Sequence, residues 1–204
     1  MLLLETQLPA RFSSLSRQQI PFMQELFRNF RGLELVPKQV HSRADLKKFL
    51  DYARRDRTIA AVHIVSHGEY STRRPVIVLT GNERINLAAP EGRALFRNLK
   101  AEVIFFSCCE LGRHEDLMRN LLRVSGADAI FSYTDTVRDY QAFMAESLFY
   151  NLAYGYVHGR ESTLTLVGVY ERLKVILHFL AIDKNRDSLT HPLLVADFAD
   201  DLKQ

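Results

Sequence analysis

Two nearly continuous apolar stretches decide the fold: Thr58–Ser66, which reads TIAAVHIVS, and Glu102–Ser107, which reads EVIFFS. A strand with water on one face alternates apolar and polar residues, whereas a strand covered on both faces of a parallel sheet stays apolar throughout. Both stretches therefore predict central strands of a parallel sheet. The first is followed by His67-Gly68 and the second by Cys108-Cys109, so each strand ends in residues that can carry chemistry.

Helical patterns separate the apolar stretches. Apolar residues recur every three or four positions over Ile20–Phe30 and over Leu46–Ala53, where Ser42 is the expected N-cap. Further helices are expected at Glu91–Leu99, Leu117–Leu122, Val137–Tyr154 and Leu164–Phe179, further strands at Leu2–Leu4, Leu33–Pro37 and Ala127–Tyr133, and a hairpin at Val76–Leu87. Strands that alternate with helices predict an α/β fold, a mostly parallel central sheet flanked by helices in three layers.

Length and composition fit one folded domain spanning residues 1–204. Hydrophobic residues make up 47% of the chain and charged residues 25%, close to the averages of folded proteins. The 27 basic and 24 acidic side chains leave a net charge of +3, too small for a general nucleic-acid surface. No apolar run reaches the roughly 18 residues of a membrane span, and the opening MLLLE lacks the basic region of a signal peptide. We therefore expect a cytoplasmic protein that binds neither nucleic acid nor membrane.

The only two cysteines, Cys108 and Cys109, are neighbours. Adjacent cysteines close no loop, so a stabilising disulfide framework is not expected and a reducing compartment is. Structural zinc sites space their cysteines two to four residues apart, so we expect no metal and no cofactor. A phosphatase loop needs arginine six positions after the cysteine, where this chain has His114 or Glu115.

The ends of the two central strands predict a cysteine-histidine site. Ligands of parallel sheets gather at the carboxyl ends of the strands, where His67 and the cysteine pair are expected to meet. A thiol attacks as the thiolate, which a neighbouring histidine can generate, and backbone amides at Gly68 and at the cysteine can hold an oxyanion. The alternatives are structural: a buried cysteine is often a small core residue, and His63, inside the strand, fits a hydrogen-bonded core histidine.

Two motifs resemble a known family. Ile64–Gly68 (IVSHG) and Val103–Gly112 (VIFFSCCELG) are similar to the His-Gly and Ser-Ala-Cys-x-x-Gly signatures of CHAT-type domains. These domains are caspase-like cysteine peptidases, related more distantly to separase, gingipain and the metacaspases. The likeness extends to Ser125–Ile130 and to His191–Leu194. It implies a caspase-like three-layer fold.

The resemblance also implies roles for individual residues. It makes Cys109 the nucleophile, with Cys108 where the family has alanine, and His67 the general acid and base. The amides of Gly68 and Cys109 become the oxyanion donors. Caspases proper have glycine two positions after the cysteine, where this chain has Leu111, so the later Gly112 favours the CHAT branch.

The implied activity is that of a cysteine endopeptidase that cleaves a protein substrate through a thioester. If the protein is bacterial, the family suggests a regulated role in stress or anti-phage defence, with a regulatory or activating protein as a second partner. A docking module without catalysis and a thiol redox sensor are the alternative functions.

Specificity rests on weaker signals. Relatives that cleave after arginine or lysine often carry an acidic residue two positions before the nucleophile, where this chain has Ser107. A pocket for a basic side chain would then draw on Asp135. An N-cap for the helix expected near Val137 explains Asp135 equally well.

Overall fold

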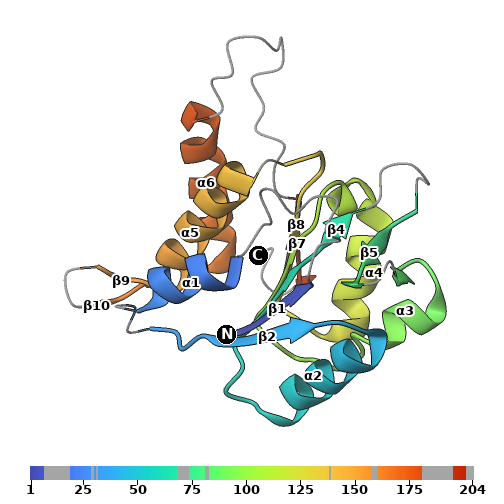
Figure 1. Cartoon of the computed structure of the whole chain (residues 1–204). Helices are drawn as coiled ribbons and strands as arrows, with labels where there is room; N and C mark the ends of the chain where they lie inside the picture. Colours follow the sequence, from blue (N-terminus) through green and yellow to red (C-terminus); the bar gives the residue numbers. More distant parts are fainter. Residues whose placement is uncertain are drawn as a thin grey trace.

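A mostly parallel six-stranded sheet forms the centre of the protein (Figure 1). The computed structural model describes residues 1–6, 19–28, 30, 32–68, 74–80, 83–137, 139–157, 160–180 and 195–200. The strand order is β11-β8-β7-β3-β1-β2. The bounds are β1 Leu2–Thr6, β2 Val36–Val40, β3 Ala61–Val65, β7 Val103–Ser107, β8 Ala129–Ser132 and β11 Val195–Phe198. Five strands run parallel and β11 pairs antiparallel with β8, which confirms the predicted α/β class.

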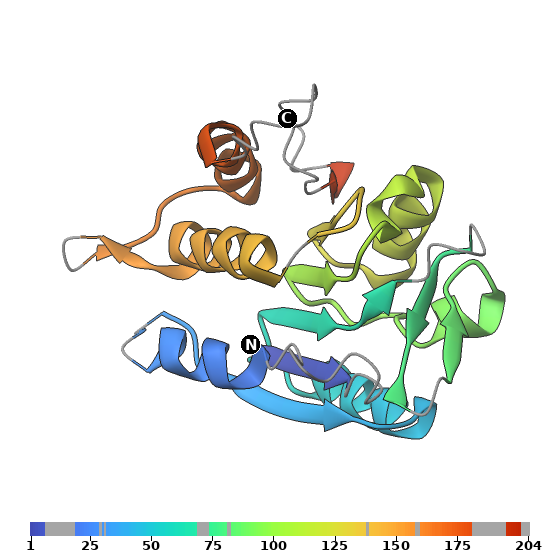
Figure 2. The same ribbon diagram turned by 45° about the horizontal axis from the view of Figure 1, so that its top comes forward.

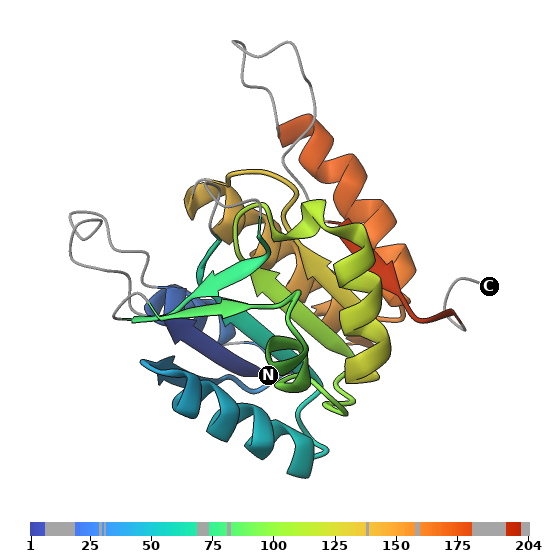
Figure 3. The same ribbon diagram turned by 90° about the vertical axis from the view of Figure 1, so that its right-hand side faces the viewer.

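Helices cover both faces of this sheet and complete three layers (Figure 3, in which α2 and α4 face the viewer). One face carries α2 Arg43–Arg55, α3 Pro90–Ala94 and α4 Glu115–Ser125, and the other carries α1 Gln19–Phe27, α5 Asp139–Tyr154 and α6 Leu166–Leu180. Successive strand residues point to opposite faces, so Ile104 and Phe106 pack in the first core while Val103 and Phe105 pack in the second. This double burial explains why the central strands are apolar throughout.

A small antiparallel sheet follows β3, and Ser66 alone separates the two. It consists of β4 His67–Gly68, β5 Val76–Val78 and β6 Arg84–Asn86, in that order. Figure 2 shows it beyond the arrowheads of the central strands. The hairpin predicted at Val76–Leu87 is thus present as β5 and β6. Its expected turn, Gly81-Asn82, lies outside the described ranges. A second pair of short strands, β9 Tyr156–Val157 and β10 Arg160–Glu161, joins α5 to α6.

Several local predictions are confirmed and others are wrong. Ser42 caps α2, because its hydroxyl accepts from the Asp45 N–H while the Asp45 carboxylate accepts from the Ser42 N–H. The strand expected at Leu33–Pro37 lies three residues later, at Val36–Val40. The helix expected at Glu91–Leu99 ends at Ala94.

Candidate active site

The two motifs leave the sheet side by side. β3 and β7 are parallel neighbours with Val65 opposite Ser107, and the Ser66 N–H donates to the Ser107 carbonyl at 3.3 Å. The chain order reverses between β1 and β3, so the topological switch point lies beside β3 and one strand away from β7. Ligands of open α/β sheets bind at the carboxyl ends of the strands, and the carboxyl ends of β3 and β7 carry the two motifs.

Gly68 lies directly against Cys109. A Cβ atom added at Gly68 would be 1.9 Å from the carbonyl oxygen of Cys109 and 2.9 Å from its carbonyl carbon. Only glycine allows two backbones to approach so closely. The structure thus brings the His-Gly motif and the cysteine into contact.

The two cysteines have different environments. Cys108 is fully buried among the residues under α2 and α4, and its Sγ lies 3.9 Å from the Ile64 carbonyl oxygen. Cys109 is half-buried, and its Sγ lies 3.4 Å from the Val137 backbone nitrogen and 3.8 Å from the Val137 carbonyl oxygen. The N–H can donate to a thiolate and the carbonyl can accept from a thiol. Cys109 is therefore the cysteine with both solvent access and polar contacts suited to either protonation state.

The turn after Cys109 explains the Cys-x-x-Gly spacing. Glu110 has φ 61°, a left-handed conformation that costs a non-glycine residue about 1–2 kcal/mol. Its amide donates to the Asp135 carbonyl at 3.2 Å, and the amide of Gly112 donates to the Tyr133 carbonyl at 2.8 Å. A Cβ at Gly112 would be 2.9 Å from that same oxygen. Close contact with the loop after β8 thus requires glycine at this position.

Ser66 holds the backbone of His67 in place. The buried Ser66 hydroxyl donates to the Val78 carbonyl at 2.6 Å and accepts from the Val78 N–H at 3.1 Å. Val78 is the residue of β5 that stands opposite His67 in the small sheet. The half-buried His67 is therefore anchored on both sides, by Ser66 through β5 and by Gly68 against Cys109.

The two candidate substrate-binding residues, Ser107 and Asp135, differ in solvent exposure and in their partners. Ser107 is fully buried, and its hydroxyl donates to Glu146 Oε1 at 2.6 Å, so it is held inside the protein. The Asp135 side chain is 47% exposed and forms an ion pair with Arg113 at 3.1 Å. α5 begins at Asp139, so Asp135 is not its N-cap. Asp135 instead lies beside the turn that follows Cys109.

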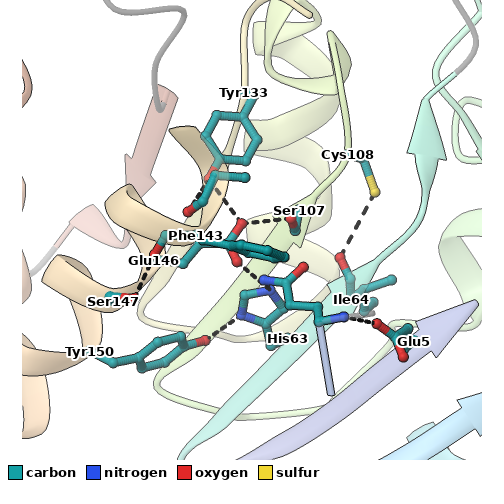
Figure 4. A network of polar contacts seen from close by, with 12 residues as sticks. Glu5, His63, Ile64, Ser107, Cys108, Tyr133, Phe143, Glu146, Ser147 and Tyr150 are labelled. Atoms are coloured by element: carbon teal, nitrogen blue, oxygen red, sulfur yellow. Dashed lines mark hydrogen bonds and ion pairs between the residues drawn. The ribbon is translucent and has the colours of Figure 1, made fainter. Parts of the chain in front are cut away.

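A buried polar network that was not predicted from the sequence lies behind the site (Figure 4). Glu146 Oε1 accepts from Ser107 and from the Tyr133 hydroxyl at 2.9 Å, and its Oε2 lies 3.4 Å from His63 Nε2. His63 Nδ1 lies 2.7 Å from the Tyr150 hydroxyl, and burial raises the pKa of Tyr150, so this phenol keeps its proton. Tyr150 can therefore donate to Nδ1, while Nε2 lies 3.4 Å from Gln19 Nε2 and 3.4 Å from Glu146 Oε2.

One sequence signal could have revealed this network. Glu146 shares a helix face with Ala142, Ala145, Phe149 and Tyr150, all fully buried. A carboxylate within an apolar stripe needs buried hydrogen-bond donors. Ser107 and Tyr133 are these donors, and His63, hydrogen-bonded to Tyr150, is the core histidine expected from its place inside the strand.

The described residues contain no cluster of three or more histidine, cysteine, aspartate or glutamate side chains that could hold a metal ion. None of the helices formed by these residues is long and apolar enough to span a bilayer.

The predicted His191–Leu194 motif lies outside the described ranges. A scan against protein-family models finds no matching family, and a search of curated proteins finds no match. Function is therefore inferred from the geometry of the site.

Proposed function

We propose that this protein is a cysteine endopeptidase of the caspase-like, CHAT type, with Cys109 as nucleophile and His67 as general acid and base. The observation that carries the proposal is the backbone contact between Gly68 and Cys109 at the carboxyl edge of β3 and β7. This contact brings the only half-buried thiol of the described residues beside the residue that follows His67. The order of histidine, small antiparallel sheet and Cys-x-x-Gly turn also agrees with the resemblance.

The proposed reaction begins when His67 accepts the thiol proton of Cys109. The thiolate attacks the scissile carbonyl carbon, and the amides of Gly68 and Cys109 donate hydrogen bonds to the resulting oxyanion. The intermediate collapses, the carbon–nitrogen bond breaks, and His67 returns the proton to the leaving amine. Water, deprotonated by His67, then hydrolyses the thioester on Cys109, which releases the new carboxyl terminus and regenerates the thiol.

The proposal also covers Cys108, Asp135, the cellular compartment and the partners. The buried Cys108 takes no part in the reaction, and Asp135 lies near enough to the nucleophile turn to contribute to recognition of a basic side chain. A thiol nucleophile suits a reducing compartment such as the cytoplasm. The substrate is a protein, and a regulatory protein activates cleavage, in stress or anti-phage defence if the protein is bacterial.

A peptide library derived from a proteome tests this function. Wild type and the Cys109→Ala, Cys108→Ala and His67→Ala variants are incubated with the library, and new termini are identified by mass spectrometry. We expect cleavage by wild type and by Cys108→Ala, and none by the other two variants. Cleavage that survives Cys109→Ala but is lost in Cys108→Ala would overturn the assignment of the nucleophile. Absence of cleavage by wild type would favour a docking module.

A further inference from the structure

The proposed mechanism gives no role to Glu146, a fully buried carboxylate. Glu146 lies on α5 with no exposed surface, in the layer opposite α2 and α4. A buried carboxylate is strongly unfavourable unless hydrogen-bond donors surround it. Ser107 and Tyr133 supply such donors to Oε1, and His63 Nε2 lies 3.4 Å from Oε2, so the side chain is held in one position.

Both donors come from the strand ends on either side of the nucleophile turn. Ser107 is the last residue of β7 and stands two residues before Cys109. Tyr133 follows β8 directly, and its carbonyl accepts from the Gly112 amide at 2.8 Å. Both hydroxyls donate to the same oxygen, Glu146 Oε1, at 2.6 and 2.9 Å. One carboxylate oxygen thus joins the segment before Cys109 to the segment that anchors the turn after it.

The loop after Tyr133 also reaches the thiol itself. Residues 133–137 run from the Gly112 contact to Val137, whose N–H lies 3.4 Å from Cys109 Sγ. A displacement of Tyr133 would therefore move both the turn and the N–H that can stabilise the thiolate. His63, 3.4 Å from the other oxygen of Glu146, lies within β3 and is hydrogen-bonded to Tyr150, away from the turn.

We propose that Glu146 is a positioning residue, which fixes Cys109 by tying Ser107 to Tyr133 beneath the nucleophile turn. This inference rests on the proposed function. Glu146 does not touch the substrate in this account, because it is fully buried behind the two strand ends.

Single-hydroxyl deletions test the proposal within one network. Ser107→Ala and Tyr133→Phe each remove one tie to Glu146, and Tyr150→Phe removes an equally buried hydroxyl that contacts only the His63 side of the network. We expect the first two variants to lower kcat on the best library peptide by at least about tenfold with KM unchanged, since small misplacements of reacting groups reduce rates steeply. Tyr150→Phe should retain kcat within about twofold, because both ties to Glu146 remain.

Glu146 itself is tested by conservative replacement. Glu146→Gln keeps an acceptor oxygen for Ser107 and Tyr133 and should retain most of the activity, whereas Glu146→Ala removes both ties. Urea unfolding of every variant measures its stability. Equal loss of kcat in Tyr150→Phe and Ser107→Ala would show a merely structural network and overturn the proposal, as would full activity in both Ser107→Ala and Tyr133→Phe.

The rate of Cys109 alkylation by iodoacetamide, followed by peptide mapping, separates this proposal from the proposed function. If wild type cleaves no peptide, the endopeptidase assignment fails. Slower alkylation of Cys109 in Ser107→Ala and Tyr133→Phe, with an unchanged rate in Tyr150→Phe, would still support positioning of the thiol by Glu146. Identical alkylation rates in all variants would refute it.

Discussion

Replacing Gly68 with alanine perturbs the contact on which the site depends. The new Cβ would lie 1.9 Å from the Cys109 carbonyl oxygen, and Cβ atoms essentially never approach another atom closer than 3.0 Å. The two backbones must therefore separate by about 1.1 Å or more. The nearest atoms all belong to the Cys109 backbone, so no side-chain rotation can relieve the overlap.

The magnitude follows from this displacement. Overpacking of a closely packed site costs about 1–3 kcal/mol of stability. A misplacement of about 1 Å between reacting groups lowers the rate by about 100-fold, which is about 2.7 kcal/mol in the activation barrier. We expect Gly68→Ala to fold with reduced stability and to lose most of its peptidase activity.

Urea unfolding and kcat/KM on a cleaved library peptide provide the assay. Gly168→Ala on α6 is the matched control, because its Cβ would meet only side-chain atoms, Thr165 Oγ1 at 3.3 Å and Leu164 Cδ2 at 3.9 Å. Gly168 is the third residue of α6 and its Cβ would press only on the ends of side chains, so this control should keep its activity and lose much less stability than Gly68→Ala. A Gly68→Ala variant with the stability and kcat/KM of wild type would refute the reasoning.

Three further predictions concern the supports of the site and the fold. Ser66→Ala leaves both Val78 backbone groups without the hydroxyl and should cost about 1–3 kcal/mol in urea unfolding, with a fall in kcat through His67; unchanged unfolding and kcat would contradict this anchor. Gly126→Ala, at φ 65° after α4, should cost about 1–2 kcal/mol without changing kcat, and an equal stability of variant and wild type would contradict it. Ser42→Ala should cost about 1 kcal/mol through loss of the α2 N-cap. Hydrogen bonding by the Ser42 side chain lowers the pKa of Asp45 from 3.8, so this part of the stability is present above pH 3.8 and is lost as the pH falls through the lowered pKa. Acid unfolding curves of Ser42→Ala should show less of this loss, and superimposable curves would count against the cap.

The sequence predicts the parts of this protein whose signals are local. β3 and β7 are apolar because both of their faces are buried, and the residues that follow them come to the same edge through the geometry of parallel sheets. The cap of α2 depends on Ser42 and Asp45, three residues apart. These features need no knowledge of distant segments.

Other parts depend on contacts between distant segments. Ser107 and Glu146 are 39 residues apart, so the sequence suggests a role in substrate specificity from the position of Ser107 two residues before Cys109, whereas the fold buries its hydroxyl against Glu146. β2 is an edge strand of mostly partly buried residues, including Pro37, and lacks the apolar run that marks the central strands. α3 ends at Ala94, and Asn98, inside the range predicted as helix, has φ 55°, a conformation that its residue type does not predict.

The most direct test of the central claim is the pH dependence of Cys109 alkylation in wild type and in His67→Ala. Iodoacetamide reacts with the thiolate, so a histidine that takes the proton accelerates the reaction near neutral pH. Burial alone protects Cys108, so the comparison is made at Cys109 in both proteins by peptide mapping. We expect rapid alkylation of Cys109 in wild type near pH 7 and at least about tenfold slower alkylation in His67→Ala, with both proteins equally reactive at high pH. Superimposable pH–rate curves for the two proteins would contradict a catalytic pairing of His67 with Cys109.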